Sequence, residues 1–409
     1  MSNPQIHQQS NPSKFTTDKS LLPSGISMRG GRESGQTLFV LLVLIIAIAI
    51  GFVFDYSRPT ALAIEHDKQT AAALALAKTA LIGYAASDAN RPGELPCPDV
   101  DNDGASTPPL DYVGSNCGNL VGRLPWKTLG LPDLRDGSGE RLWYTLSDNF
   151  HAGANPPLTS DTMGQLTVTG GAPATNVVAI VFSPGEVLNT QVRDPANQNN
   201  VANYLEGENA NGDTIFTTGA ASATFNDRLL VITTADLMPV VEQRVAREII
   251  SILQSYKTAT AALGYNGGAG VYPWADISDG NSNTGLNRGR FPCNSATPEN
   301  WGPPMPTLPN WLTNGCLVTP LSGWSKVIYY AAAQNRLDAG CSTCTAATLS
   351  VDGVAGTDLV LLTPGAAGAS PRGAWTTAYF IDSENTNNDD NYVTPSSTAY
   401  DRNRLFKIP

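Results

Sequence analysis

The longest apolar run of the chain lies near its start, from Thr37 to Phe54, and it contains no charged residue. About 20 apolar residues are enough to cross the hydrocarbon core of a bilayer as a helix. Asp55 follows the run, whereas the residues before it include four cations: Lys14, Lys19, Arg29 and Arg32. This asymmetry predicts a single membrane span with a cytoplasmic amino terminus and an exported remainder. A cleaved signal peptide is the competing interpretation, but its apolar core is shorter, and Gly51-Phe-Val-Phe54 is a poor cleavage site.

Two later segments, Gln69 to Ala86 and Val241 to Leu263, carry apolar residues at helical spacing. The positions that define this spacing are Leu74, Leu76, Ala77 and Leu81 in the first segment, and Val245, Ile249, Ile252, Leu253 and Tyr256 in the second. Short apolar runs bounded by Gly, Pro, Asn and Asp follow each segment and predict strands. A helix followed by consecutive strands predicts an α+β fold in which an antiparallel sheet packs on the helix.

The exported part reads as one unit written twice. Leu95-Pro-Cys97 matches Phe291-Pro-Cys293, and a second cysteine follows each motif, Cys117 and Cys316. Further matches keep the same order along the chain: Ala80 to Tyr84 with Ala261 to Tyr265, Arg141 to Tyr144 with Val327 to Tyr330, Tyr204 to Asn209 with Phe380 to Asn385, and Arg228 to Ile232 with Arg404 to Ile408. The order of these matches predicts two tandem globular domains.

The boundary between the two copies is predicted near Thr233 to Pro239, with Asp236 as the cap of the second helix. The expected organisation is a cytoplasmic leader, a membrane helix and two globular domains, with bounds 1–35, 36–58, 59–235 and 236–409.

Composition narrows the class of protein. The 409 residues include 38 Gly and 29 Pro but only 15% charged residues, which favours a β-rich, loop-rich exported part. The net charge of −11 argues against a nucleic-acid partner, because the positive surface that binds phosphate is missing. The six cysteines all lie in the predicted exported part: Cys97, Cys117, Cys293, Cys316, Cys341 and Cys344. An even number of cysteines outside the cytoplasm favours disulfides over free thiols, and over a zinc site at the CxxC of Cys341 and Cys344.

The apolar amino-terminal helix, joined to a helix-packed antiparallel sheet, resembles type IV pilins and the pseudopilins of type II secretion. Gly35 lies just before the span, where a prepilin peptidase would cut, so the resemblance implies a methylated amino terminus at Gln36. Gly51 and Pro59 stand where pilin helices commonly carry helix-loosening residues. The motifs around Cys97 and at Gly122-Arg-Leu-Pro-Trp126 are similar to exported segments of prepilin-like proteins.

One departure from the pilin pattern concerns the fifth mature position. Pilins usually carry a glutamate there, which pairs with the amino terminus of a neighbouring subunit, whereas this chain has Val40. Among pilin-like proteins this lack is typical of minor, tip-type subunits. The doubled globular part is a second departure, because it would not stack easily along a thin filament but could cap the end of one.

Two acidic segments are candidate calcium sites. Asp99, Asp101 and Asp103 precede Gly104 with the spacing of a calcium loop, although Leu110 stands where an EF-hand has its final glutamate. A weaker second set is Asp382, Glu384 and Asp389, with the polar loop Glu206 to Asp213 as its counterpart in the first copy. The alternative for both segments is a solvated acidic turn.

Catalysis is not expected, because the only histidines, His7, His66 and His151, suit no catalytic triad. The alternative is a glycosidase that uses two carboxylates, with tryptophans lining its sugar site.

The sequence therefore predicts a minor pilin or pseudopilin that initiates or caps a filament, with other pilins and the inner membrane as partners and the globular part in the periplasm or on a surface filament. The alternative is a single-span, membrane-anchored adhesin or ligand-binding protein.

Overall fold

The structure is a computed structural model that describes residues 34–107, 112–113, 116–151, 153, 158–188, 190–276, 286–293, 301, 306–314, 323–337, 346–366, 389–394 and 404–409. For residues 34–40, 47, 49–61, 112–113 and 404 only the backbone is described. The chain divides into two compact units, Met1–Leu62 and Ala63–Pro409.

Helix α1 (Ser34–Ser87) has 54 residues and is about 80 Å long at about 1.5 Å per residue. Gly35, Gln36, Gly51 and Pro59 all lie in this continuous helix. Where the structure describes its side chains, α1 is long and apolar enough over Leu62–Ser87 to cross a membrane, and a third of that stretch is buried in the structure. The predicted span lies upstream of this stretch.

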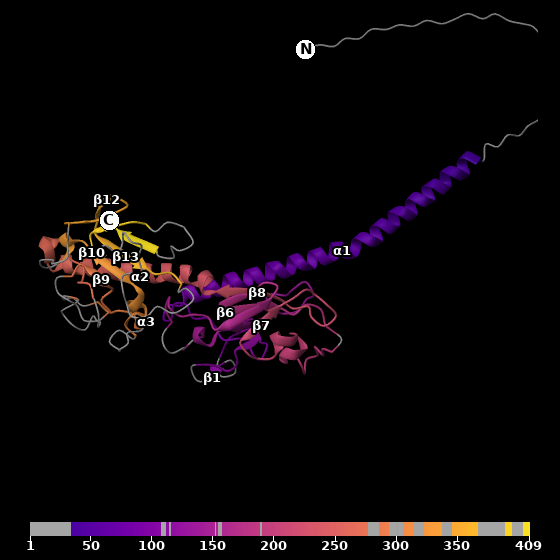
Figure 1. Ribbon diagram of the computed structural model, residues 1–409, viewed down its shortest axis with the longest axis horizontal. Helices are drawn as coiled ribbons and strands as arrows, with labels where there is room; N and C mark the ends of the chain where they lie inside the picture. Colours follow the sequence, from indigo (N-terminus) through magenta and orange to yellow (C-terminus); the bar gives the residue numbers. More distant parts are fainter. Residues whose placement is uncertain are drawn as a thin grey trace, which may run out of the picture. The chain divides into compact units, whose positions relative to one another are not determined.

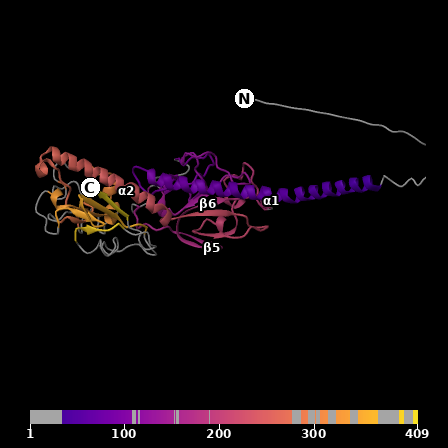
Figure 2. The ribbon, with the colours of Figure 1, turned by 90° about the horizontal axis from the view of Figure 1, so that it is seen from above.

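The carboxyl-terminal part of α1 packs on the globular unit through one narrow face. Ala73, Ala77, Leu81 and Ala85 recur every four residues and are all buried, because positions four apart share one side of a helix. Leu76, which the sequence pattern placed on this face, is 44% exposed. These side chains belong to the same buried cluster as residues of β6, and α1 crosses the first sheet in the view of Figure 2.

The remaining elements follow in chain order (Figure 1). The helices after α1 are η1 (Asp148–Phe150), η2 (Val201–Asn203), η3 (Gly207–Ala210), α2 (Thr234–Ala262), η4 (Tyr265–Gly268), α3 (Asn310–Thr313), η5 (Trp324–Val327) and η6 (Gln334–Arg336). The strands are β1 (Tyr112–Val113), β2 (Asn116–Cys117), β3 (Val121–Arg123), β4 (Trp143–Leu146), β5 (Leu166–Gly170), β6 (Ala174–Ser183), β7 (Ile215–Thr218), β8 (Arg228–Thr233), β9 (Arg288–Arg290), β10 (Tyr329–Ala332), β11 (Leu349–Val351), β12 (Val354–Thr357), β13 (Leu359–Thr363), β14 (Asn391–Tyr392) and β15 (Arg404–Ile408). The predicted α+β class with antiparallel sheets is confirmed; the exceptions among the described pairs are β5–β7 and β11–β14, which are parallel.

The first sheet has the order β3-β4-β6-β5-β7, and β8 also pairs with β6. Its long central strand β6 is buried on both faces because successive side chains alternate. Ala179 and Val181 face the core that contains α1 and α2. Ile180 and Phe182 face a second core, which the segment carrying Tyr204 covers.

The first sheet passes directly into α2. Thr233 is the last residue of β8 and also the N-cap of α2, where its hydroxyl accepts the Asp236 N–H while the Asp236 side chain accepts the Thr233 N–H. Asp236 is therefore the third residue of the helix and not its cap, which corrects the sequence prediction. Thr233 is the N-cap in place of Asp236 because Thr233 has the extended backbone conformation that an N-cap requires.

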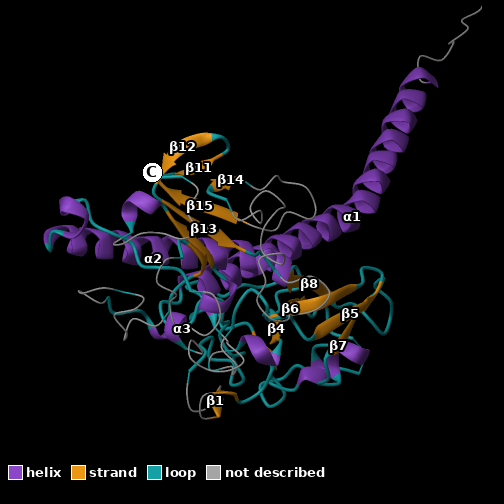
Figure 3. Ribbon diagram, turned by 60° about the vertical axis from the view of Figure 1, so that its left-hand side comes forward, coloured by secondary structure: helices purple, strands orange, loops and turns teal. Residues whose placement is uncertain are grey.

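The second sheet has the order β15-β13-β10-β9, and α2 runs behind its strands (Figure 3). Its pairing repeats that of β8-β6-β4-β3 in the first sheet. Tyr144 of β4 lies opposite Val181 and Gly122, and Tyr330 of β10 lies opposite Leu361 and Gly289.

The same register places the cysteines at different positions in the two sheets. Arg123-Leu-Pro-Trp126 leaves β3 as Arg290-Phe-Pro-Cys293 leaves β9. Asp99 forms an isolated bridge with Arg123, as Asp276 does with Arg290. Cys293 thus corresponds to Trp126, and the match of Leu95-Pro-Cys97 with Phe291-Pro-Cys293 is not the one that the ladders show.

Residues Ala63–Pro409 form one compact unit that contains both sheets, and the predicted domain bounds 59–235 and 236–409 stay a prediction. One continuous cluster of buried apolar side chains includes residues of α1, α2 and both sheets. Within it, the fully buried Glu242 of α2 accepts hydrogen bonds from Ser160 Oγ at 2.5 Å and from Thr363 Oγ1 of β13 at 2.9 Å. A single carboxylate therefore joins the segment before β5 to the second sheet.

We expect Glu242→Ala to lower the free energy of unfolding by about 3 kcal/mol, because it leaves two buried hydroxyls without their acceptor. The matched control is Gln243→Ala, which truncates the neighbouring exposed residue of the same helix and should change stability by less than about 0.5 kcal/mol. Chemical denaturation of both variants measures the difference, and equal stabilities would contradict this role of Glu242.

Candidate functional site

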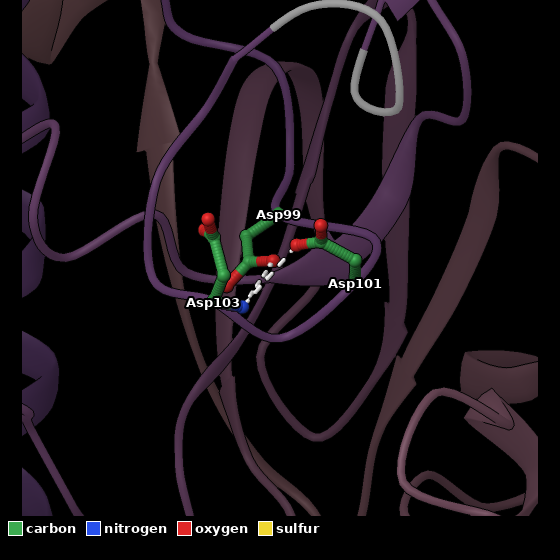
Figure 4. Close-up of side chains that lie close together, drawn as sticks. All are labelled: Asp99, Asp101 and Asp103. Carbon is green, nitrogen blue, oxygen red and sulfur yellow. Dashed lines mark hydrogen bonds between the residues drawn. The ribbon is translucent and has the colours of Figure 1, made fainter.

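The loop Asp99–Gly104 brings the three predicted aspartates together (Figure 4). Each of Asp99, Asp101 and Asp103 has one carboxylate oxygen that lies within 4.8 Å of the corresponding oxygens of the other two. Calcium ligands lie about 2.3–2.6 Å from the ion, so oxygens at this separation fit around a single cation. Asp101 and Asp103 are solvent-accessible, whereas Asp99 is buried beneath them.

Backbone N–H groups of the loop converge on Asp99. Its Oδ1 accepts the N–H of Asn102 at 2.6 Å and of Asp103 at 3.2 Å, and its Oδ2 accepts the N–H of Gly104 at 2.7 Å. Burial nevertheless raises the pKa of Asp99 to about 6, and the hydrogen bonds from Gly104 and Asn102 oppose this rise. The Asp99 carboxylate therefore closes the loop, and the outer two carboxylates face solvent.

Two close backbone approaches fix the position of this loop. A Cβ on Gly122 would lie 2.7 Å from the Asp99 carbonyl oxygen, so only glycine allows the bridge between Asp99 and β3. Gly104 has φ +88°, and a Cβ there would lie 2.5 Å from the Trp126 ring. A disulfide joins Cys97, two residues before the loop, to Cys117 of β2.

Arg123 of β3 packs against the segment that contains Gln198 and Tyr204. Its guanidinium is 4.4 Å from the ring centroid of Trp143 and 4.0 Å from that of Tyr204, and it donates to the Gln198 carbonyl at 2.9 Å. Burial lowers the pKa of Arg123, and the partners that oppose this include Tyr204. Asn102 also donates to the Gln198 side chain, so the aspartate loop and the Gln198 segment contact each other.

A second acidic pair lies beyond Tyr204, between residues far apart in sequence. The Glu206 N–H donates to Asp227 Oδ2 at 2.8 Å, and the Asp227 N–H donates to Glu206 Oε2 at 3.1 Å. Burial, with the adjacent Glu206 carboxylate, raises the pKa of Asp227 to about 8. Asp227 Oδ1 is buried with no hydrogen-bond partner. Asp227 is therefore protonated at neutral pH beside an acidic neighbour.

Sequence reasoning placed Glu206 in an acidic loop but missed Asp227. The available signal was its position directly before the matched block Arg228 to Ile232. A lone aspartate before a strand does not reveal its partner, because the pair forms only when the η3 loop folds back onto β8.

The other predicted site residues divide into three groups. In the weaker acidic set, Asp389 accepts the N–H of Asn391 at 2.7 Å. Cys293 is disulfide-bonded, and no free cysteine occurs among the described residues. The predicted residues outside the described ranges are Cys316, Cys341, Cys344, Asp382 and Glu384, with Leu110 of the first acidic loop.

No protein-family model, curated protein or solved structure matches this chain.

We expect Asp99→Ala to destabilise the protein by about 3 kcal/mol, because three backbone N–H groups lose their charged acceptor. Asp103→Ala is the matched control: its exposed side chain accepts only the Ala105 N–H among the bonds described, so its cost should be about 1 kcal/mol. Thermal unfolding measures both, and a smaller effect for Asp99 than for Asp103 would be evidence against the loop-closing role. The same curves with calcium and with a chelator test the calcium prediction, because an ion held only by the folded state raises the midpoint.

The raised pKa of Asp227 predicts a pH dependence of stability. Proton binding by folded Asp227 stabilises the protein fully below its ordinary pKa, and this contribution is lost as the pH rises through about 8. Asp227→Asn keeps a neutral side chain that can donate to Glu206, so it should gain on the order of 2 kcal/mol relative to the wild type between about pH 5 and about pH 9. Glu208→Gln, an exposed position in the same loop, should follow the wild type. Parallel pH profiles for wild type and Asp227→Asn would refute the assignment.

Proposed function

We propose that this chain is a minor, tip-type subunit of a type IV pilus-like or type II secretion filament, with a structural role in assembly. The observation that carries the proposal is the exposed apolar surface of α1. Consecutive large apolar side chains there are about half exposed: Leu41, Leu42, Val43, Leu44, Ile45, Ile46 and Ile48.

These residues cover more than one turn, so the helix is apolar on every side in this stretch. A helix that is apolar all round belongs in a membrane or among other apolar helices. A subunit that moves from the inner membrane into a filament core needs a helix whose surface suits both environments. The same surface would serve in each, with other pilins or pseudopilins as partners.

The missing charge at Val40 is consistent with an end position. A buried glutamate in the span would be costly unless it paired with a neighbour. A subunit without it makes only apolar contacts along the bundle, and it does not need the subunit above. Cleavage after Gly35 by a prepilin peptidase, with methylation of Gln36, completes this proposal.

The globular unit supports an end position through its size. We propose that its two sheets are copies of one pilin-like unit, α1 with β3-β4-β6-β8 and α2 with β9-β10-β13-β15. The matching strand orders and registers support this duplication. A doubled unit with a shared core is larger than one helix-packed sheet, which favours capping over stacking.

A single-span anchored adhesin or ligand-binding protein is the second candidate, because it would use the same apolar helix without assembly. Mass spectrometry of the mature amino terminus separates the two. A methylated Gln36 supports the filament subunit, whereas an intact Met1 with no association with filaments supports the anchored protein.

We expect Ile45→Asp to reduce incorporation into filaments on the order of 100-fold, because a charge at the centre of an apolar span costs about 3 kcal/mol. Ile64→Asp is the matched control: Ile64 is 56% exposed on the same helix but lies beyond the predicted span. Quantitative immunoblots of sheared filaments and of membranes measure both variants. Equal incorporation of the two, or incorporation of a fragment that begins at Asp55, would exclude the proposed role of the helix.

A further inference from the structure

Two acidic side chains, Glu206 directly before η3 and Asp227 directly before β8, each hold the backbone of the other. The two residues are 8% and 5% exposed. The Glu206 N–H donates to Asp227 Oδ2 at 2.8 Å, and the Asp227 N–H donates to Glu206 Oε2 at 3.1 Å. Glu206 Oε2 also accepts the Asn226 N–H at 3.0 Å. The pair therefore fastens two segments that are 21 residues apart in sequence, and it is called the carboxyl clasp below.

The surroundings of the carboxyl clasp favour one negative charge over two. Two adjacent carboxylates in a buried place disfavour each other's ionised form. Asp227 Oδ1 is buried with no partner, so ionisation of Asp227 would place charge on an oxygen that no donor contacts. Donors already contact the other oxygens, including Gln191 Nε2 on Glu206 Oε1 at 2.6 Å and Asn209 Nδ2 on Asp227 Oδ2 at 2.9 Å. A cation would have to displace these donors, whereas a proton on Oδ1 displaces none.

No cationic side chain forms an ion pair with either carboxyl group of the clasp among the residues that the structure describes. The charged and titratable side chains on the surrounding segments contact other groups or solvent: Arg193 with Glu140, Arg228 with Asp67, Arg123 with the Tyr204 ring, and Glu186, Glu208 and Asp213 in solvent. Burial raises the pKa of Asp227 to about 8, and the Glu206 carboxylate adds to this rise. The charge state of the clasp is thus set by the two acids themselves.

The carboxyl clasp anchors the connection between β7 and β8, residues 219–226. Residues 219–224 of this connection are exposed. A hydrogen bond from the Ser222 N–H to the Phe225 carbonyl, at 2.7 Å, lies within the connection itself. The hydrogen bonds described between the connection and other parts of the chain start at Asn226, with Glu206 and with the Glu186 carbonyl as acceptors. The position of the connection therefore depends on the clasp.

We propose that the carboxyl clasp is a proton-operated latch, which holds the connection between β7 and β8 against the segment of η3 and releases it when the proton is lost. The pairing of β8 with β6 begins at Arg228, after the clasp, so the release leaves the sheet intact. This inference is independent of the filament proposal, since it needs neither the span nor assembly.

The direction of the pH dependence follows from linkage. Folded Asp227 keeps its proton to a higher pH than it does in the open state, where water surrounds the carboxyl group. The closed state is therefore most favoured below the ordinary pKa of an aspartate, and it loses this advantage as the pH rises towards about 8. Above about pH 9 the open and closed states bind the same number of protons, so the population of the open state stops rising.

Hydrogen exchange measured by mass spectrometry on the full chain in detergent micelles tests the latch. After correction for the intrinsic pH dependence of exchange, opening at the N–H groups of Glu206, Asn226 and Asp227 should rise on the order of 10- to 100-fold between about pH 5.5 and about pH 8.5. Residues 178–182 of the central strand β6 report global unfolding. At about pH 8.5 the three N–H groups of the clasp should exchange at least about 10 times faster than those of β6.

Asp227→Asn stays neutral at every pH and places an amide group at the unpaired oxygen, so its opening should change by less than about 2-fold over the same pH range. Glu208→Gln is the matched control, because it neutralises an exposed carboxylate of η3 and should keep the pH dependence of the wild type. Glu206→Gln removes the neighbouring charge, so its rise in opening should level off at a lower pH. This second variant keeps the proposal testable if Asp227→Asn does not fold.

Four results would each overturn the proposal. The first is equal exchange at the clasp and at β6, because opening would then be global. The second is opening that does not depend on pH in the wild type, as a merely structural contact predicts. The third is an unchanged pH profile in Asp227→Asn or in Glu206→Gln. The fourth is closure of the connection at about pH 8.5 by added calcium, because a cation would then replace the proton.

Discussion

The globular unit depends on the direct junction between β8 and α2. Because Thr233 ends the strand and caps the helix, no loop separates β8 of the first sheet from α2. Lys78 of α1 reinforces the junction: its Nζ pairs with Asp236 at 3.0 Å and donates to the Val231 carbonyl at 3.0 Å. Hydrogen bonds from Thr233 and Lys78 outweigh the effect of burial and lower the pKa of Asp236. Two helices and a strand thus meet at one hydrogen-bonded corner, and α2 must share its buried face with both sheets.

This sharing explains why two similar sheets form one compact unit. The two ladders have matching orders and registers, but the side chains around corresponding positions differ. Arg123 stacks between Trp143 and Tyr204, whereas Arg290 makes a buried ion pair with Asp276. Both solutions compensate a buried guanidinium, one mainly with aromatic faces and carbonyl groups and the other with a carboxylate. Backbone geometry is kept where glycine is required, at Gly122 and Gly289, and the chemistry around it has changed.

The sequence predicted local features well and long-range ones poorly. Helical periodicity located the buried faces of α1 and α2, and the Asp99 to Gly104 spacing predicted a compact acidic loop, because these depend on residues close together in the chain. It misplaced Leu76, since an alanine-rich helix can present either of two adjacent faces. The ion pair of Arg288 with Asp390 joins residues 102 positions apart, so no local sequence pattern predicts it.

The repeat itself shows how a true pattern can be aligned wrongly. Leu-Pro-Cys and Phe-Pro-Cys match in letters, but the ladders equate Leu95-Pro-Cys97-Pro-Asp99 with Tyr272-Pro-Trp274-Ala-Asp276. A cysteine and a tryptophan have therefore exchanged places between the two halves. Backbone positions next to a required glycine are constrained by close approach, whereas a cysteine is constrained only by its partner. Strand register is for this reason the stronger guide to which residues of the two halves correspond, and it assigns the disulfides of the two halves to different places on the fold.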